Sequence, residues 1–140
     1  MPPPDIIDVQ PLAAAPRSGL VTLAHVIYAL HAFAVLSGVL SSATIVGSFV
    51  SGLPSIVAVI LNYLKRSEVR GTWLDSHFRW QIRTFWFALL WILVAIGLAL
   101  TLIGIPFALI LVAGAGLWVI YRVVRGWLAL KDGRPMPVPD

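Results

Sequence analysis

Two long uncharged runs dominate the chain, and a charged segment separates them. The first run, residues 18–64, contains no Lys, Arg, Asp or Glu, and neither does the second run, residues 84–121. As single helices the runs would be about 70 Å and about 57 Å long, whereas the hydrocarbon core of a bilayer is about 30 Å thick. Each run is therefore expected to fold back on itself and cross a membrane twice.

A polar cluster at residues 41–44 predicts the turn in the first run, with spans over residues 20–40 and 45–64. Pro54 falls inside the second of these spans. There it removes one helical hydrogen bond and is expected to kink the helix. A short re-entrant segment that ends near Pro54 is the alternative.

The sequence Leu-Ile-Gly-Ile-Pro, residues 102–106, predicts the turn in the second run. Glycine commonly ends a helix, and proline is tolerated in the first turn of the next one because its missing donor is not needed there. The resulting spans cover residues 85–103 and 106–124.

The charged segment is predicted to be a loop followed by an amphipathic lead-in to the third span. Thr72 and Asp75 have the spacing of a capping box, so a helix is expected to begin at Trp73. Asp75 and Arg79 stand at positions i and i+4 in the order that favours an ion pair.

The distribution of charges predicts how the chain is threaded. With four spans, all ten Lys and Arg residues lie on one side of the membrane, and the two short turns on the other side carry none. The positive-inside rule then places both termini in the cytoplasm. We predict an all-α, integral membrane four-helix bundle, with a flexible Pro-rich tail over residues 1–19, a transmembrane domain over 20–130 and a C-terminal tail over 131–140.

Composition supports lipid as the surrounding solvent. Of the 140 residues, 59% are hydrophobic and 11% are charged, and the mean hydropathy is +0.93, whereas soluble domains are about 25% charged. The net charge of +4 does not indicate a nucleic-acid partner, because the basic residues flank the apolar runs instead of forming a separate basic face.

Basic and aromatic residues gather at the predicted cytoplasmic interface. One interpretation is anchoring, with arginines on lipid phosphates and tryptophans at the headgroup level. The other is a site between helices for an anionic headgroup or an anionic partner segment, built from Arg79, Arg83, Arg122 and Arg125. The candidate binding residues are Lys65, Arg66, Arg70, Arg79, Arg83, Arg122 and Arg125. The candidate interfacial anchors are Trp73, Trp80, Trp86, Tyr121 and Trp127.

Few residues offer chemistry. The chain has no Cys, which excludes thiolate nucleophiles and Cys-based metal sites. His25 and His31 are six positions apart, about 240° around a helix, so they cannot hold one metal ion together. No phosphate loop, nucleophile elbow or HExxH motif is present. We therefore predict no catalytic residue, no metal and no cofactor.

Polar and small residues within the spans are predicted to join helices. The candidate polar contacts are His25, Asn62, His77 and Gln81. His25 is expected either to be buried and hydrogen-bonded close to Tyr28 or to meet His77. A ridge of small residues recurs every four positions at Ala43, Gly47, Ser51 and Ser55. It fits close approach of the first or third span, of a second copy, or of a larger complex.

Several stretches resemble a known family: the early His25, GLPSIVAVILNYLKR at residues 52–66, HFRWQI at 77–82 and GRPMP at 133–137. The chain resembles, over residues 20–137, a group of small bacterial four-span membrane proteins of unknown function. That group is distantly similar to the small channel-forming subunit of the chloroplast inner-envelope protein translocon. The resemblance implies a four-helix fold and a multi-pass location in the bacterial cytoplasmic (inner) membrane.

These observations lead to an expected role as a non-enzymatic accessory, scaffold or assembly subunit that engages partners through helix surfaces. A transport or channel component is the alternative that the translocon likeness suggests, although no span carries the polar lining of an ion path. A protein that binds or modifies anionic lipids is the third hypothesis. The expected partners are anionic lipid headgroups at the cytoplasmic face and either further copies of the chain or a larger membrane complex.

Overall fold

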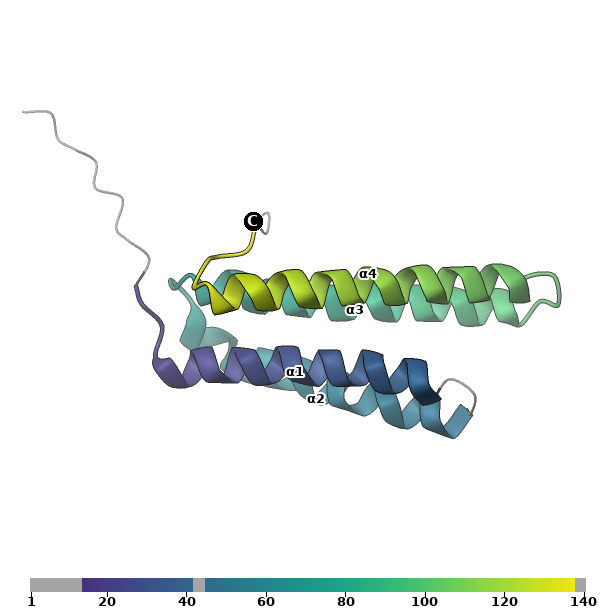
Figure 1. Ribbon diagram of the computed structural model, residues 1–140, viewed down its shortest axis with the longest axis horizontal. Helices are drawn as coiled ribbons and strands as arrows, with labels where there is room; N and C mark the ends of the chain where they lie inside the picture. The colour runs from purple at the N-terminus through teal and green to yellow at the C-terminus, as the bar shows by residue number, and fades with distance from the viewer. Residues whose placement is uncertain (1–13, 42–44, 138–140) are drawn as a thin grey trace, which may run out of the picture.

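The computed structural model describes residues 14–41 and 45–137, which form four helices joined by short turns. α1 and α2 form one antiparallel pair, α3 and α4 form another, and the two pairs lie alongside each other (Figure 1). This arrangement confirms the predicted all-α four-helix fold. The helices are α1 (Ser18–Ser41), α2 (Ile45–Val69), α3 (Leu74–Ala99) and α4 (Ile105–Lys131).

Within the described residues, α1, α3 and α4 are long and apolar enough to cross a membrane. α3 has 26 residues and α4 has 27. At about 1.5 Å per residue each is about 40 Å long, enough to cross the hydrocarbon and reach into the headgroup regions. By helix length and hydropathy, the chain is a multi-pass membrane protein. α2, with 25 residues, is similar in length.

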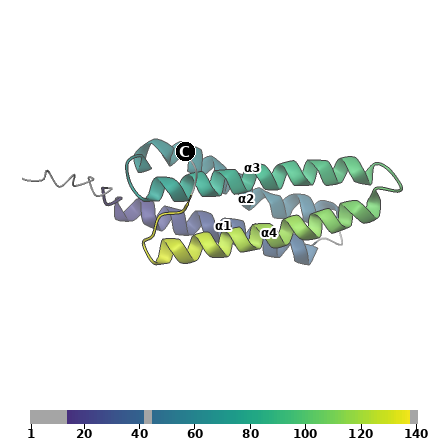
Figure 2. The ribbon, with the colours of Figure 1, turned by 90° about the horizontal axis from the view of Figure 1, so that it is seen from above.

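The charged side chains gather at one end of the bundle. α1 and α3 begin there and α2 and α4 end there (Figure 1 and Figure 2). The described Lys, Arg, Asp and Glu residues all lie near these four helix ends, and we call this the charged end. The turn at residues 100–104 marks the opposite, far end.

α2 passes through Pro54 as one continuous helix. A segment that ends near Pro54, which the re-entrant alternative requires, is therefore contradicted. Ser51, before the proline, and Ala58, after it, are both buried, which shows that α2 is packed on both sides of the interrupted hydrogen bond. Such packing allows a proline to remain inside a membrane helix.

The turn between α3 and α4 requires glycine for space. α3 ends at Ala99, earlier than the predicted 103, and Gly104 has an ordinary helical φ of −77°. A Cβ atom on Gly104 would overlap the carbonyl oxygen of Leu98 and the hydroxyl of Thr101. Pro106 lies in the first turn of α4, as predicted.

The predicted capping box is wrong. The Thr72 hydroxyl donates to the Val69 carbonyl oxygen at 2.7 Å, so it is tied to the end of α2 and does not cap α3. The residue at the cap position is Trp73, which makes no side-chain cap bond. The adjacent ion pair is confirmed, since Arg79 Nε lies 3.5 Å from Asp75 Oδ2.

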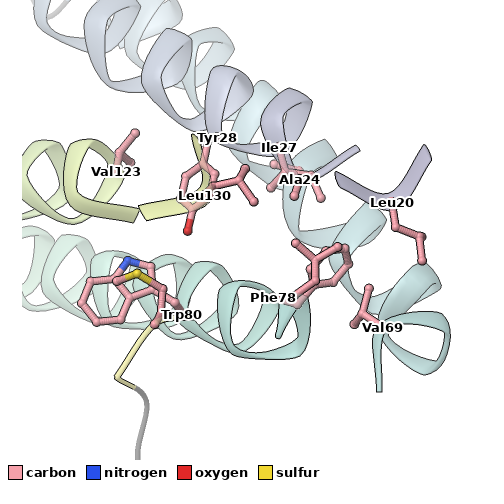
Figure 3. Close-up of a cluster of buried hydrophobic side chains, with 12 residues drawn as sticks. Leu20, Ala24, Ile27, Tyr28, Val69, Phe78, Trp80, Val123 and Leu130 are labelled. Carbon is pink, nitrogen blue, oxygen red and sulfur yellow. The ribbon is translucent and has the colours of Figure 1, made fainter. Parts of the chain in front are cut away.

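The hydrophobic core of the described residues lies toward the charged end. Figure 3 shows Phe78 of α3 directed toward Leu20 of α1 and Val69 of α2. Farther along α3 and α4, between residues 85 and 121, the buried positions are Ala95, Gly104 and Ala108. The core consists of Leu20, Ala24, Ile27, Tyr28, Ala58, Val69, Leu74, Phe78, Trp80, Val123, Leu130 and Met136.

One glycine sets the closest approach of α1 to α4. Tyr28 of α1 is 1% exposed, and its ring lies directly over the backbone of Gly126 on α4. A Cβ atom at position 126 would overlap the ring and hydroxyl of Tyr28. The two helix pairs can therefore approach this closely only because residue 126 has no side chain.

Replacing Gly126→Ala is expected to lower the free energy of unfolding by about 1–3 kcal/mol, because the added methyl overpacks the Tyr28 site. Denaturant titration of the purified protein in detergent micelles measures this. Gly114→Ala is the matched control on the same helix, since a Cβ there meets nothing within 4 Å. Equal destabilisation by both variants would contradict the proposed close approach.

Candidate functional site

A buried histidine joins three parts of the chain at the charged end. Nε2 of His77 lies 2.7 Å from the carbonyl oxygen of Arg134, and Nδ1 lies 3.0 Å from the Tyr28 hydroxyl. A carbonyl oxygen can only accept, so Nε2 carries the proton and donates it. In the neutral ring the Tyr28 hydroxyl then donates to Nδ1. His77 thereby ties α3 to α1 and to the segment that follows α4.

The segment after α4 packs back onto the start of α3. Gly133 has a positive φ of 64°, which reverses the chain. The backbone N–H of Met136 then donates to Ser76 Oγ at 2.8 Å, and the Ser76 hydroxyl donates to the Trp73 carbonyl at 2.7 Å. Residues 132–137 of the predicted C-terminal tail are therefore part of the packed structure.

His25 is hydrogen-bonded, as one of the two expectations has it, and its partner is Trp127 of α4. Its Nδ1 accepts a hydrogen bond from the Trp127 indole N–H at 3.0 Å, which links α1 to α4. Tyr28 is bonded to His77 instead. Trp127 was expected to be an interfacial anchor, and its polar atom serves a contact between helices.

The described part of the small-residue ridge faces α1. Ser55 Oγ lies 3.1 Å from Nδ1 of His31, and Ser51 is buried opposite Gly38. Hydrogen bonding between helices is a common use of such residues in membranes. Ala43 lies outside the described residues, and so do the surroundings of Gly47.

The two predicted amide contacts are fully buried. Gln81 of α3 donates from Nε2 to the Ala24 carbonyl of α1 at 3.4 Å. Asn62 of α2 is completely enclosed, and neither of its side-chain polar atoms has a hydrogen-bond partner within the part of the chain described. The helix interface at this level is thus polar as well as apolar.

Arg122 of α4 is held by α3. Its Nε donates to Thr84 Oγ1 at 2.7 Å, its Nη2 donates to the Trp80 carbonyl at 3.3 Å, and its guanidinium lies 3.5 Å from the centre of the Trp80 ring. The Trp80 indole N–H donates in return to the Arg122 carbonyl at 3.1 Å. Charged hydrogen bonds and cation–π contacts are strong where water is scarce.

The four-arginine site does not form a single open pocket. Arg122 is engaged as described, and Arg79 is paired with Asp75. Arg83 and Arg125 are exposed, and Arg125 donates to the Tyr121 hydroxyl at 2.7 Å. The exposed arginines are therefore the ones available to a ligand.

The remaining basic candidates lie at the end of α2. Lys65 bonds to Glu68 at 2.7 Å, and this hydrogen bond lowers the pKa of the Glu68 carboxyl. Arg66 and Arg70 are exposed. They extend the positive surface of the charged end without entering the bundle.

The predicted anchors divide into two groups. Trp86 and Tyr121 are exposed, and the Trp86 indole N–H donates to the Tyr63 hydroxyl of α2 at 2.9 Å. Trp80 is buried, and Trp73 packs edge-on against His77 with ring centres 5.6 Å apart. Sequence reasoning did not single out the roles of Thr84 and Ser76. A hydroxyl next to a charged helix segment is the signal that could have indicated them.

Among residues 14–41 and 45–137, no three His, Asp or Glu side chains gather as a metal site would require. Comparison with protein-family models, with curated proteins and with solved structures finds no match.

Replacing Arg122→Lys is expected to lower the free energy of unfolding by about 2 kcal/mol, because an ammonium loses the forked hydrogen bonds and the flat stacking on Trp80. Arg125→Lys is the matched control and is expected to change it by less than about 0.5 kcal/mol, since Arg125 is exposed. Unfolding titrations in micelles compare the two. Similar values would contradict the structural role of Arg122.

Proposed function

We propose that this small polytopic membrane protein is a non-enzymatic accessory or scaffold subunit of the bacterial cytoplasmic membrane. In this proposal the far halves of α3 and α4 engage the membrane helices of a partner. The observation that carries the proposal is the uneven packing of the bundle. Its core lies toward the charged end, whereas α3 and α4 bury little toward the far end.

The far halves of α3 and α4 offer the surface that helix association in lipid uses. Leu93, Ile110 and Leu117 are each more than half exposed. Gly97 and Gly114 are exposed among them, and a Cβ atom at either position meets nothing within 4 Å. Because lipid tails are as apolar as leucine, close packing at small residues is what favours helix association.

A non-enzymatic role is supported by how the polar side chains are used. His25, His31 and His77 each hold a neighbouring helix, and Arg122 holds α3. These groups are the ones that membrane-embedded chemistry would need, and they are engaged in structural contacts. The basic residues at the charged end favour placement of both termini in the cytoplasm.

Site-specific photocrosslinking in the native membrane tests the proposal. A photoreactive residue at Leu117, in the far half of α4 and 69% exposed, is expected to give a discrete protein adduct. The same residue at Leu128, near the charged end and 56% exposed, is the matched control and is expected to give adducts at least several-fold weaker. An adduct of twice the chain mass identifies the partner as a second copy.

Gly114→Leu supplies the second arm of this experiment. The added side chain blocks close approach, so the adduct at position 117 is expected to decrease while the expression level stays the same. Equal adducts at positions 117 and 128 would contradict the proposal. So would selective solute flux through liposomes that contain only the purified protein, because that result indicates a channel.

A further inference from the structure

We propose that the outer face of α3 binds one anionic phospholipid, independently of any protein partner. Arg83 contacts the phosphate, and an acyl chain lies along the apolar stripe of Trp86, Phe87 and Leu90. The site covers residues 83–90 of α3, whereas the residues of α3 assigned to a partner helix, Leu93 and Gly97, lie closer to the far end.

The four residues share one face of α3. They follow the spacing i, i+3, i+4 and i+7, which places side chains in one row along a helix. Together they line a shallow hollow of about 220 Å³. The three apolar side chains are between 43% and 52% exposed, so the row faces outward from the bundle. A row with a cation at one end and apolar groups below it matches the shape of a phospholipid.

The depth of Arg83 fits a phosphate contact. The hydrocarbon core of a bilayer is about 30 Å thick, which about 20 residues of helix span. Such a segment, counted back from the end of α3 at Ala99, begins at residue 80. The corresponding count along α4 from Ile105 reaches residue 124. Arg83 therefore lies at the edge of the hydrocarbon, from which a long side chain can extend to the headgroups. The apolar stripe continues from there into the hydrocarbon.

The charges around Arg83 favour an anionic headgroup. The described carboxylates, Glu68, Asp75 and Asp132, are paired with Lys65, Arg79 and Arg134 respectively. None of the ion pairs in the described part of the chain involves Arg83. The Arg122 guanidinium is close enough for the two like charges to interact, so the local potential is more positive than Arg83 alone would make it.

Aromatic rings extend the hollow toward α4. The Phe87 ring contacts the Trp118 ring edge-on, with centres 6.3 Å apart, and Arg122 lies 5.0 Å from the centre of the Trp118 ring. The contacts of Arg122 with Thr84 and Trp80 hold α4 against α3 at this level. Phe87 is thus held by Trp118, and Trp86 by its bond to Tyr63, which reduces the entropy cost of binding at these two side chains.

Native mass spectrometry of the full-length protein in mild detergent tests the site. After incubation with phosphatidylglycerol, Arg83→Gln is expected to retain about fivefold less lipid than the unaltered protein, the factor that one basic residue near an anionic surface contributes. Lys131→Gln removes the same charge from an exposed position at the same end of the bundle and is expected to retain lipid normally. Phosphatidylcholine, whose phosphate charge is balanced by its choline cation, is expected to bind less than phosphatidylglycerol. Arg83→Gln is expected to lower its retention by less than it lowers that of phosphatidylglycerol.

Glycerol 3-phosphate distinguishes a lipid site from a site for a free phosphate. It lacks the acyl chain, so a tenfold excess is expected to displace little bound phosphatidylglycerol; complete displacement overturns the lipid assignment. The proposal also fails if Arg83→Gln retains phosphatidylglycerol as the unaltered protein does, or if Lys131→Gln loses as much. The unfolding midpoint of each variant shows that altered retention does not result from misfolding.

Discussion

The cost of placing a charge in hydrocarbon determines how this protein is built. A single Arg, Lys or Asp at the middle of a span costs about 2.5–3.5 kcal/mol on insertion scales. The chain avoids this cost by keeping its charges out of residues 18–64 and 84–121 and folding each run into a helical hairpin. All four helices consequently present their charged ends in the same direction. The polar contacts and the core lie close to that end.

The hydrophobic core lies toward the charged end, and α3 and α4 are less packed toward the far end. His77 bonds α3 to α1 across the two helix pairs, and Arg122 bonds α4 to α3 within one pair. Gly126 lets Tyr28 lie between the pairs. Few buried positions continue this packing along α3 and α4. The resulting division gives each end a different environment. Exposed arginines lie toward one end, and exposed apolar helix surface extends to the other.

Much of the fold could be predicted from the sequence, because the length of an uncharged run indicates that it must fold back, and turn residues indicate where. The Asp75–Arg79 pair followed from helical spacing alone. The contact of Arg122 with Trp80 could not be predicted, since it joins positions that only folding brings together. The same holds for the bond between His77 and the Arg134 carbonyl. Charge patterning predicts which side of a membrane an arginine occupies but not whether it faces lipid or protein. Only the structure therefore distinguishes Arg122, which is held by α3, from the exposed Arg83 and Arg125.

The most direct test of the central claim is the accessibility of single cysteines to a membrane-impermeant maleimide in intact cells. The chain has no native Cys, so each introduced residue reports alone. Leu102→Cys, in the exposed far turn, is expected to be labelled in intact cells. Ser67→Cys, at the charged end, is expected to be labelled only after the membrane is permeabilised. Labelling of both positions from the same side would contradict the account.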